Sequence, residues 1–204
     1  MKRTGDKNLR SGQITLLERM SYSRKIFVLY FLIFIFSVSH PWALPVEDVQ
    51  LVIDAQYFQV ARKMIQEAKV SIQVMMFEMG YYEKYSNTPS NLLIKELIEA
   101  KKRGVKVEVI LEVKEGKDRT SERNRQTGKI LSDKGVEVIY DPLFKTMHAK
   151  WMVVDGEKIL LGSTNWTYYA LTNNNEVSVL IRSKQVAKGL VDYFNQVKAT
   201  GSKQ

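Results

Sequence analysis

Short apolar runs alternate with amphipathic segments along most of this chain, a pattern typical of β-strands joined by helices. Strands are predicted at Val49–Ile53, Val70–Met76, Val105–Leu111, Val136–Tyr140, Trp151–Val154, Lys158–Leu161 and Val177–Arg182. Helical spacing of apolar residues predicts helices after the first, second and last of these strands and another over residues 121–134. Asp54 and Ser90 can cap the first two helices. The order predicts an α/β fold, a mixed β-sheet flanked by helices on both faces.

The first 39 residues follow a different pattern. Ile26–Phe36 is an unbroken apolar run, preceded by Arg24 and Lys25 and followed by small residues at 37–39. This order is typical of a secretory signal peptide, and the run is shorter than the ~20 residues of a membrane span. The alternative is an uncleaved membrane anchor. We therefore expect an exported protein, periplasmic or secreted; a start at Met20 would give a segment of more usual signal length.

These patterns divide the chain into four parts. Residues 1–39 are the predicted signal peptide or membrane anchor, and residues 40–47, which contain Pro41 and Pro45, are a predicted linker. One folded domain is expected over residues 48–200, followed by a short tail at 201–204.

Composition narrows the chemistry. The 204 residues include no cysteine, which excludes disulfides, thiolate metal sites and cysteine nucleophiles, and only two histidines, which excludes a histidine-rich metal cluster within one chain. Lys and Arg number 31 against 22 Asp and Glu, a formal net charge of +9. This excess favours an anionic partner such as nucleic acid or anionic lipid. More than half of it lies in residues 1–39, which hold seven basic and two acidic residues.

One stretch places several reactive side chains at fixed spacing. His148, Lys150, Asp155, Ser163 and Asn165 form the pattern H-x-K, four residues, D, six residues, G-S-x-N. The first two are two residues apart and project from the same face of a strand. A tight turn after Asp155 would return the chain as a neighbouring strand and bring Ser163 and Asn165 back to His148. An imidazole, an ammonium, a hydroxyl and an amide together suit a tetrahedral oxyanion such as phosphate.

This pattern resembles the HKD signature of the phospholipase D superfamily, and the resemblance covers nearly all of residues 48–200. It implies that His148 attacks phosphorus and forms a phosphohistidine. Lys150 and Asn165 would hold the non-bridging oxygens with support from Ser163. No metal or cofactor is implied.

The resemblance also assigns two supporting residues. Glu176, which ends the polar segment 172–176, matches the acidic residue that accepts a hydrogen bond from the second ring nitrogen of His148 in that family. Asp155 would organise the turn of the motif and take no direct part in the chemistry.

The histidine count bears on assembly. Larger members of the family carry two HKD motifs, whereas this chain has one and no second H-x-K. A second histidine must protonate the leaving oxygen, and His40 lies in the predicted linker. We therefore expect a homodimer in which His148 of both chains meets at one two-fold site. The short bacterial endonucleases of the family and its mitochondrial Zucchini-type members are similar in this respect.

Three functions are consistent with these features. The leading prediction is a metal-independent phosphodiesterase acting as a nonspecific endonuclease on DNA or RNA, since no separate base-reading domain is present. The alternatives are a phospholipase D-type hydrolase or transferase acting on phospholipids, and a non-catalytic nucleic-acid-binding dimer. Trp166 is a candidate substrate-binding residue, by stacking, or else a packing residue; the same alternatives apply to Phe77, Tyr81, Tyr82, Tyr168 and Tyr169.

Overall fold

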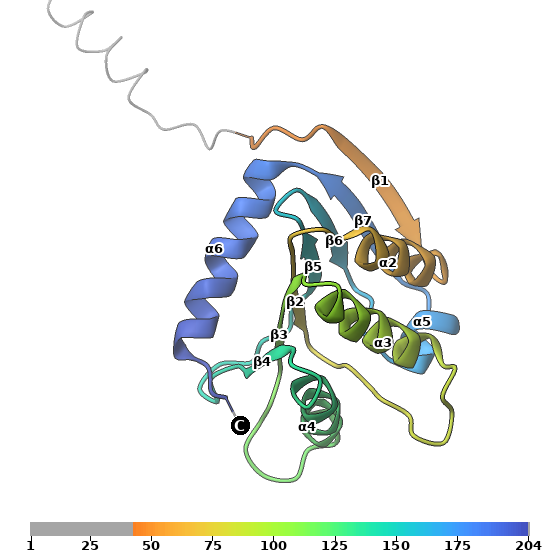
Figure 1. The fold of residues 1–204 in the computed structure, drawn as a ribbon, viewed down its shortest axis with the longest axis vertical. Coiled ribbons are helices and arrows are strands. Elements are labelled where there is room, and N and C mark those ends of the chain that lie inside the picture. Colours follow the sequence, from red (N-terminus) through yellow and green to blue (C-terminus); the bar gives the residue numbers. More distant parts are fainter. Residues whose placement is uncertain (1–42, 204) are drawn as a thin grey trace, which may run out of the picture. The chain divides into compact units, whose positions relative to one another are not determined.

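The computed structural model describes residues 43–203, so the predicted signal or anchor segment and His40 lie outside the described residues. Seven strands and five helices follow one another along this part of the chain (Figure 1). They are β1 (Asp48–Ile53), α2 (Gln56–Glu67), β2 (Ser71–Met76), α3 (Pro89–Lys102), β3 (Lys106–Leu111), α4 (Arg119–Ser132), β4 (Glu137–Tyr140), β5 (Lys150–Val154), β6 (Lys158–Gly162), α5 (Tyr168–Thr172), β7 (Val177–Arg182) and α6 (Lys184–Thr200). Within residues 43–203, no helix has the length and apolar character needed to cross a membrane.

The strands form one mixed sheet, which confirms the predicted fold class. Their order is β1-β7-β6-β5-β2-β3-β4. The pairs β2–β3 and β3–β4 are parallel, and all other neighbours are antiparallel. The crossover helices α3 and α4 join the parallel strands, as parallel connections require. All seven predicted strands are present.

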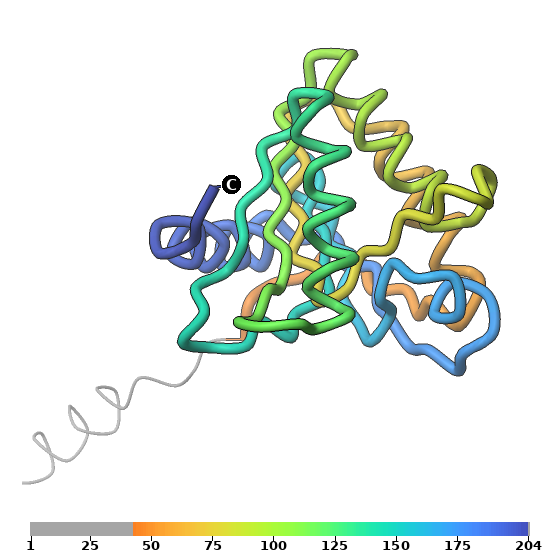
Figure 2. Tube along the Cα trace, turned by 90° about the horizontal axis from the view of Figure 1, so that it is seen from below, coloured from red at the N-terminus to blue at the C-terminus, as the bar shows by residue number. Residues whose placement is uncertain are grey.

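Helices cover both faces of this sheet (Figures 1 and 2). Consecutive residues of β2 point to opposite faces: Val74 and Met76 pack in the core under α2 and α3, and Met75 packs in the core under α6. In that second core Trp151 meets Phe194 of α6 edge-on, with ring centroids 6.1 Å apart. Because both cores are tightly packed, the central strands are nearly rigid supports for the segments at their ends.

Two predicted helix caps are wrong. Asp54 does not cap α2, because the N-cap of α2 is Ala55, which makes no side-chain cap bond. The Asp54 carboxylate instead accepts a hydrogen bond from the Glu176 backbone N–H at 2.7 Å. Ser90 lies within the first turn of α3, which Thr88 caps instead, and its hydroxyl donates to the Gly80 carbonyl at 2.6 Å. In both cases a tertiary contact takes the side chain away from the local helix end.

Candidate active site

The central strands bring the motif residues to one end of the sheet. Lys150 opens β5 and is paired with Met76, the last residue of the antiparallel strand β2. The Phe77 N–H extends this ladder by donating to the Ala149 carbonyl at 3.0 Å. Strand β6 runs back beside β5 and ends at Gly162, so Ser163 and Asn165 follow it at the end where His148 lies.

His148 and Lys150 lie side by side. The Lys150 Nζ is 3.4 Å from Nδ1 and 3.5 Å from Nε2 of the imidazole, and it donates to the His148 carbonyl at 2.9 Å. Lys150 is buried whereas His148 is exposed. The exposed ring is therefore open to a substrate, and the ammonium is held beneath it.

This arrangement sets the protonation of both groups. The positive charge of Lys150 lowers the pKa of His148, and partial burial and Lys114 lower it further. A lowered pKa favours the neutral form of the imidazole, which has a free lone pair. Burial lowers the pKa of Lys150, an effect that the negative charge of Glu176 opposes.

Phe77 forms one wall of the site. Its ring centroid lies 4.5 Å from that of His148 and 4.9 Å from the Lys150 Nζ. The aromatic face is a favourable neighbour for the ammonium, and the ring limits the rotation of the imidazole. The sequence left open whether Phe77 serves the site or the core, and its contacts place it at the site.

Ser163 and Glu176 form a bonded pair across β6 and β7. The Ser163 hydroxyl donates to Glu176 Oε2 and accepts from the Val177 N–H at 3.1 Å. Glu176 is buried and its other oxygen accepts from the Asn174 amide at 3.1 Å. The hydrogen bond expected from His148 to Glu176 is not among those of residues 43–203. Here Glu176 orients Ser163.

Asn165 carries unused hydrogen-bonding capacity. Its Oδ1 is a buried atom that has no hydrogen-bond partner within residues 43–203. Nearly all buried polar atoms in proteins are paired, so an unpaired one beside reactive side chains fits a residue that binds a ligand. Turning the amide would put its NH₂ group, the donor that a phosphate oxygen needs, in the same place.

Asp155 lies at the opposite end of β5 from His148. Its carboxylate accepts from the backbone N–H groups of Lys69, Val70 and Ser71 at 3.0, 2.7 and 3.0 Å. Burial acts to raise its pKa, but these donors outweigh burial and the pKa of Asp155 is lowered. Asp155 thus links the turn between β5 and β6 to the start of β2. Its role is structural.

Trp166 lies in the core. Its side chain is 0% exposed, and its indole N–H donates to the Tyr57 hydroxyl at 3.1 Å. Because the ring presents no face to solvent, substrate stacking on Trp166 is excluded and packing is its role.

A buried carboxyl pair supports the segment that leads into His148, and sequence reasoning missed it. Glu112 Oε2 accepts from the Met147 N–H at 2.7 Å, and Asp141 Oδ1 accepts from the Val113 N–H at 3.1 Å. Burial raises the pKa of Glu112 to about 7, and the neighbouring Asp141 contributes. No sequence signal marks these residues, because only the fold brings the ends of β3 and β4 to Met147.

Within residues 43–203, no group of three or more His, Asp or Glu side chains could hold a metal ion.

Comparison with known proteins places this site in a family. The family model "Cardiolipin synthase, PLD-like domain" matches residues 61–198. The chain belongs to the phospholipase D superfamily. The mixed sheet and the motif residues gathered at one end of it agree with this assignment.

Individual relatives differ in what their names say. The chain is 30% identical over 95 residues to a mitochondrial cardiolipin hydrolase of Canis lupus familiaris, covering 47% of this chain and 35% of the relative. It is 30% identical over 125 residues to a phospholipase D of Rickettsia typhi, covering 61% and 58%. The matches thus span about a third to three fifths of the length of these relatives.

Solved structures share the fold. Nuc from Salmonella typhimurium, a phospholipase D family member, superposes with a TM-score of 0.65 at 24% identity, covering 77% of this chain and 97% of Nuc. NucT from Helicobacter pylori superposes with a TM-score of 0.60 at 16% identity, covering 77% and 100%.

Proposed function

We propose that this chain is a metal-independent nuclease that hydrolyses DNA or RNA through a phosphohistidine on His148. The observation that carries the proposal is the exposed imidazole of His148 held against the buried ammonium of Lys150. Asn165, at the same end of the sheet, adds a donor for a phosphate, and Ser163 is held there by Glu176. The fold shared with Nuc and NucT and the basic excess of the chain favour a nucleic-acid substrate.

The reaction has two displacements. The His148 lone pair attacks phosphorus, a P–N bond forms, and the P–O bond to the leaving oxygen breaks as that oxygen takes a proton from a second histidine. Water then attacks phosphorus, loses a proton to the second histidine, and breaks the P–N bond. Lys150 and Asn165 offset the negative charge on the non-bridging oxygens in both steps.

The second histidine comes, in this proposal, from another copy of the chain. An apolar surface that a second copy could cover adjoins the site: Leu51 and Ile53 of β1 and Val177 of β7 are 64%, 40% and 57% exposed. Ile53 is paired with Val177, so these side chains share one face of the sheet. Val177 begins β7 beside Ser163, so a copy docked on this face would reach the end of the sheet that carries the catalytic residues.

The test uses the purified full-length chain with plasmid, single-stranded DNA and RNA in excess EDTA. Cleavage is expected to persist in EDTA and to fall by at least about a thousandfold in His148→Ala, because the nucleophile is lost. His40→Ala is the matched control, since it removes the only other histidine, and it should cleave like the wild type. Cleavage abolished by EDTA, or retained in His148→Ala, would contradict the proposal.

A phospholipid substrate is the second candidate, and one observation favours it. Leu143 and Phe144 are 56% and 81% exposed in the loop that leads to His148. Apolar side chains at such a tip suit insertion into a lipid surface. Cardiolipin and phosphatidylglycerol vesicles therefore accompany the nucleic acids in the same assay. Release of phosphatidic acid by a chain that leaves every nucleic acid intact would establish this candidate in place of the nuclease.

A further inference from the structure

A pocket of about 690 Å³ adjoins the catalytic residues and has no part in the two displacements described above. This volume falls within the roughly 300–1,000 Å³ range of small-ligand sites. Its walls come from the loop after β2, from the first turns of α4 and from the segment that follows Asn165. We call it the Tyr–Arg pocket after its lining, which includes Tyr82, Tyr85, Tyr168, Tyr169, Arg119 and Arg123.

The Tyr–Arg pocket and the catalytic centre are built on the same two backbone segments. Phe77 contacts His148, and the next residue, Glu78, lines the pocket. Likewise Thr167 of the pocket follows Asn165 with only Trp166 between them. The segments are bridged: the Trp166 N–H donates to the Glu78 carbonyl at 3.0 Å, and the Gly80 N–H donates to the Trp166 carbonyl at 2.8 Å. On each segment the pocket therefore begins within two residues of a residue of the catalytic centre.

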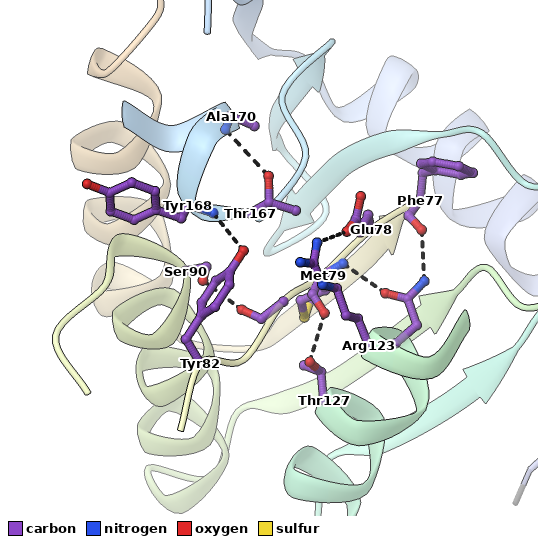
Figure 3. Close-up of polar contacts among 12 residues, drawn as sticks. Phe77, Glu78, Met79, Tyr82, Ser90, Arg123, Thr127, Thr167, Tyr168 and Ala170 are labelled. Atoms are coloured by element: carbon purple, nitrogen blue, oxygen red, sulfur yellow. Dashed lines mark hydrogen bonds and ion pairs between the residues drawn. The ribbon is translucent and has the colours of Figure 1, made fainter. Parts of the chain in front are cut away.

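The polar centre of the pocket is held in place. Arg123 donates to Glu78 at 2.6 Å, and its guanidinium lies 5.9 Å from the Tyr82 ring centroid. The Tyr82 hydroxyl accepts from the Tyr168 N–H at 3.1 Å. Figure 3 shows the Glu78 carboxylate beside Arg123, while the Phe77 ring points away from this ion pair.

Buried bonds anchor the loop that carries Glu78. The Met79 N–H donates to Asn124, the Thr127 hydroxyl donates to the Met79 carbonyl, and the Ser90 hydroxyl donates to the Gly80 carbonyl, at 2.8, 2.7 and 2.6 Å. All three partner side chains are fully buried. The pocket is thus preformed, which lowers the ordering cost of binding a ligand.

Charge and aromatic surface indicate the ligand. Arg123 is neutralised by Glu78, whereas Arg119 is exposed and forms no ion pair within residues 43–203. One free cation beside four tyrosine rings suits a ligand that combines a planar ring with a phosphate. An acyl chain would offer no polar group to Arg119 or to the Glu78–Arg123 pair. An isolated headgroup phosphate would make no stacking contact with the tyrosine rings.

We propose that the Tyr–Arg pocket binds an unpaired nucleotide next to the scissile phosphodiester. The base stacks on the tyrosine rings with its edge toward Glu78 and Arg123, and Arg119 contacts the adjoining phosphate. This inference rests on the proposed nuclease function and adds a strand preference. A base held in a duplex cannot enter the pocket, so single strands are the better substrate.

The experiment measures kcat/KM of the full chain on three phosphodiesters in EDTA: a single-stranded oligonucleotide, the same strand with abasic sites throughout, and bis(4-nitrophenyl) phosphate. Tyr168→Leu is expected to lower kcat/KM on the oligonucleotide about tenfold, since a stacked base is lost. Tyr168→Phe keeps the ring and should match the wild type. Both variants should hydrolyse the abasic strand and the small diester like the wild type. Arg119→Ala should lower kcat/KM on both strands and not on the small diester.

Matched controls are available on distant surfaces. Tyr193 of α6 is 42% exposed, close to the 41% of Tyr168, so Tyr193→Leu removes a comparable ring. Lys134→Ala removes one exposed positive charge just after α4, as Arg119→Ala does at its start. Neither control should change any of the three rates.

The outcomes separate the two proposals. If Tyr168→Leu and Arg119→Ala cut the oligonucleotide like the wild type while cleavage still requires His148, the pocket inference is wrong and the nuclease proposal stands. Equal losses on the small diester would also overturn it, because the variants would then have damaged the catalytic centre. If the wild type hydrolyses the small diester and no nucleic acid, the nuclease proposal itself fails. The variants are also assayed on cardiolipin vesicles, and a loss confined to these vesicles would overturn the inference and assign the pocket to lipid.

Discussion

At the scale of single residues, the contact between His148 and Lys150 is the basis of the proposed chemistry. The ammonium lies 3.4–3.5 Å from both ring nitrogens and lowers the pKa of the imidazole. A histidine with a lowered pKa keeps its lone pair at a more acidic pH. The ordinary pKa of histidine is about 6.5. The acid limb of the pH–rate profile should therefore lie below that value.

This relation predicts the effect of Lys150→Met. Removing the ammonium should raise the pKa of His148 toward its ordinary value, because the largest cause of the shift is gone. An NMR titration of the His148 ring measures it without requiring activity, and the His40 ring, in the same chain, serves as an internal reference. Lys158→Met, at the far end of β5 and β6, should leave the pKa of His148 unchanged. A His148 pKa that falls or stays constant in Lys150→Met would refute the electrostatic account.

Residue roles could be predicted only where they follow from local geometry. The side-by-side placement of His148 and Lys150 follows from their spacing of two residues, although only Lys150 belongs to β5 and His148 lies in the segment that leads into it. The partners of Glu176 do not: Asp54 binds its N–H and Ser163 its carboxylate, and these contacts depend on the register of β1, β6 and β7. Trp166 shows the same limit, since its burial depends on Tyr57, 109 positions away.

At the scale of elements, the strands could be predicted almost completely, because apolar runs of the right length report burial directly. The order in which they pair could not, since β1 joins β7 at the edge and β5 inserts beside β2. That order decides the site. It places Phe77 next to His148 and puts the start of β7 beside Ser163.

The junction of β6 and β7 explains the glycine of the motif. A Cβ at Gly162 would collide with the Ser178 side chain and the Val177 carbonyl. Gly162→Ala should therefore push the two strands apart, lower the free energy of unfolding by about 1–3 kcal/mol and displace Ser163. Urea unfolding and the cleavage rate measure the two effects.

A glycine in α6 provides the comparison for this prediction. Gly189 is exposed, and no neighbouring atom lies within 4 Å of the place that a Cβ would take, so Gly189→Ala should stabilise the helix by up to about 1 kcal/mol. Activity should not change. If Gly162→Ala proves as well tolerated as Gly189→Ala, the close approach of β6 to β7 is not what requires glycine.

At the scale of the whole molecule, two proposals concern what surrounds the domain. The order of residues 1–39 supports export, with these residues as a cleaved signal or a retained anchor.

The second proposal is the shared active site. One folded domain carries one HKD motif, and the apolar surface at Leu51, Ile53 and Val177 reaches the same end of the sheet. If two copies dock through this surface, Leu51→Lys should shift the protein toward monomers. Val70→Lys, at a similarly exposed apolar position on the other end of the sheet, should not.

Subunit mixing tests the shared site most directly. In a shared site each dimer needs both copies of His148, one as nucleophile and one as acid, so a mixed dimer of wild type and His148→Ala is inactive. When exchanging wild-type chains are diluted with His148→Ala chains, activity should fall as the square of the wild-type fraction, to about a quarter at equal amounts. Independent sites would retain about half. Dilution with His40→Ala chains should cost nothing, because that histidine plays no part. A linear decline would mean that the leaving-group proton comes from within the same chain. Since His148 is the only histidine among residues 43–203, the acid would then be His40 or a residue of another type.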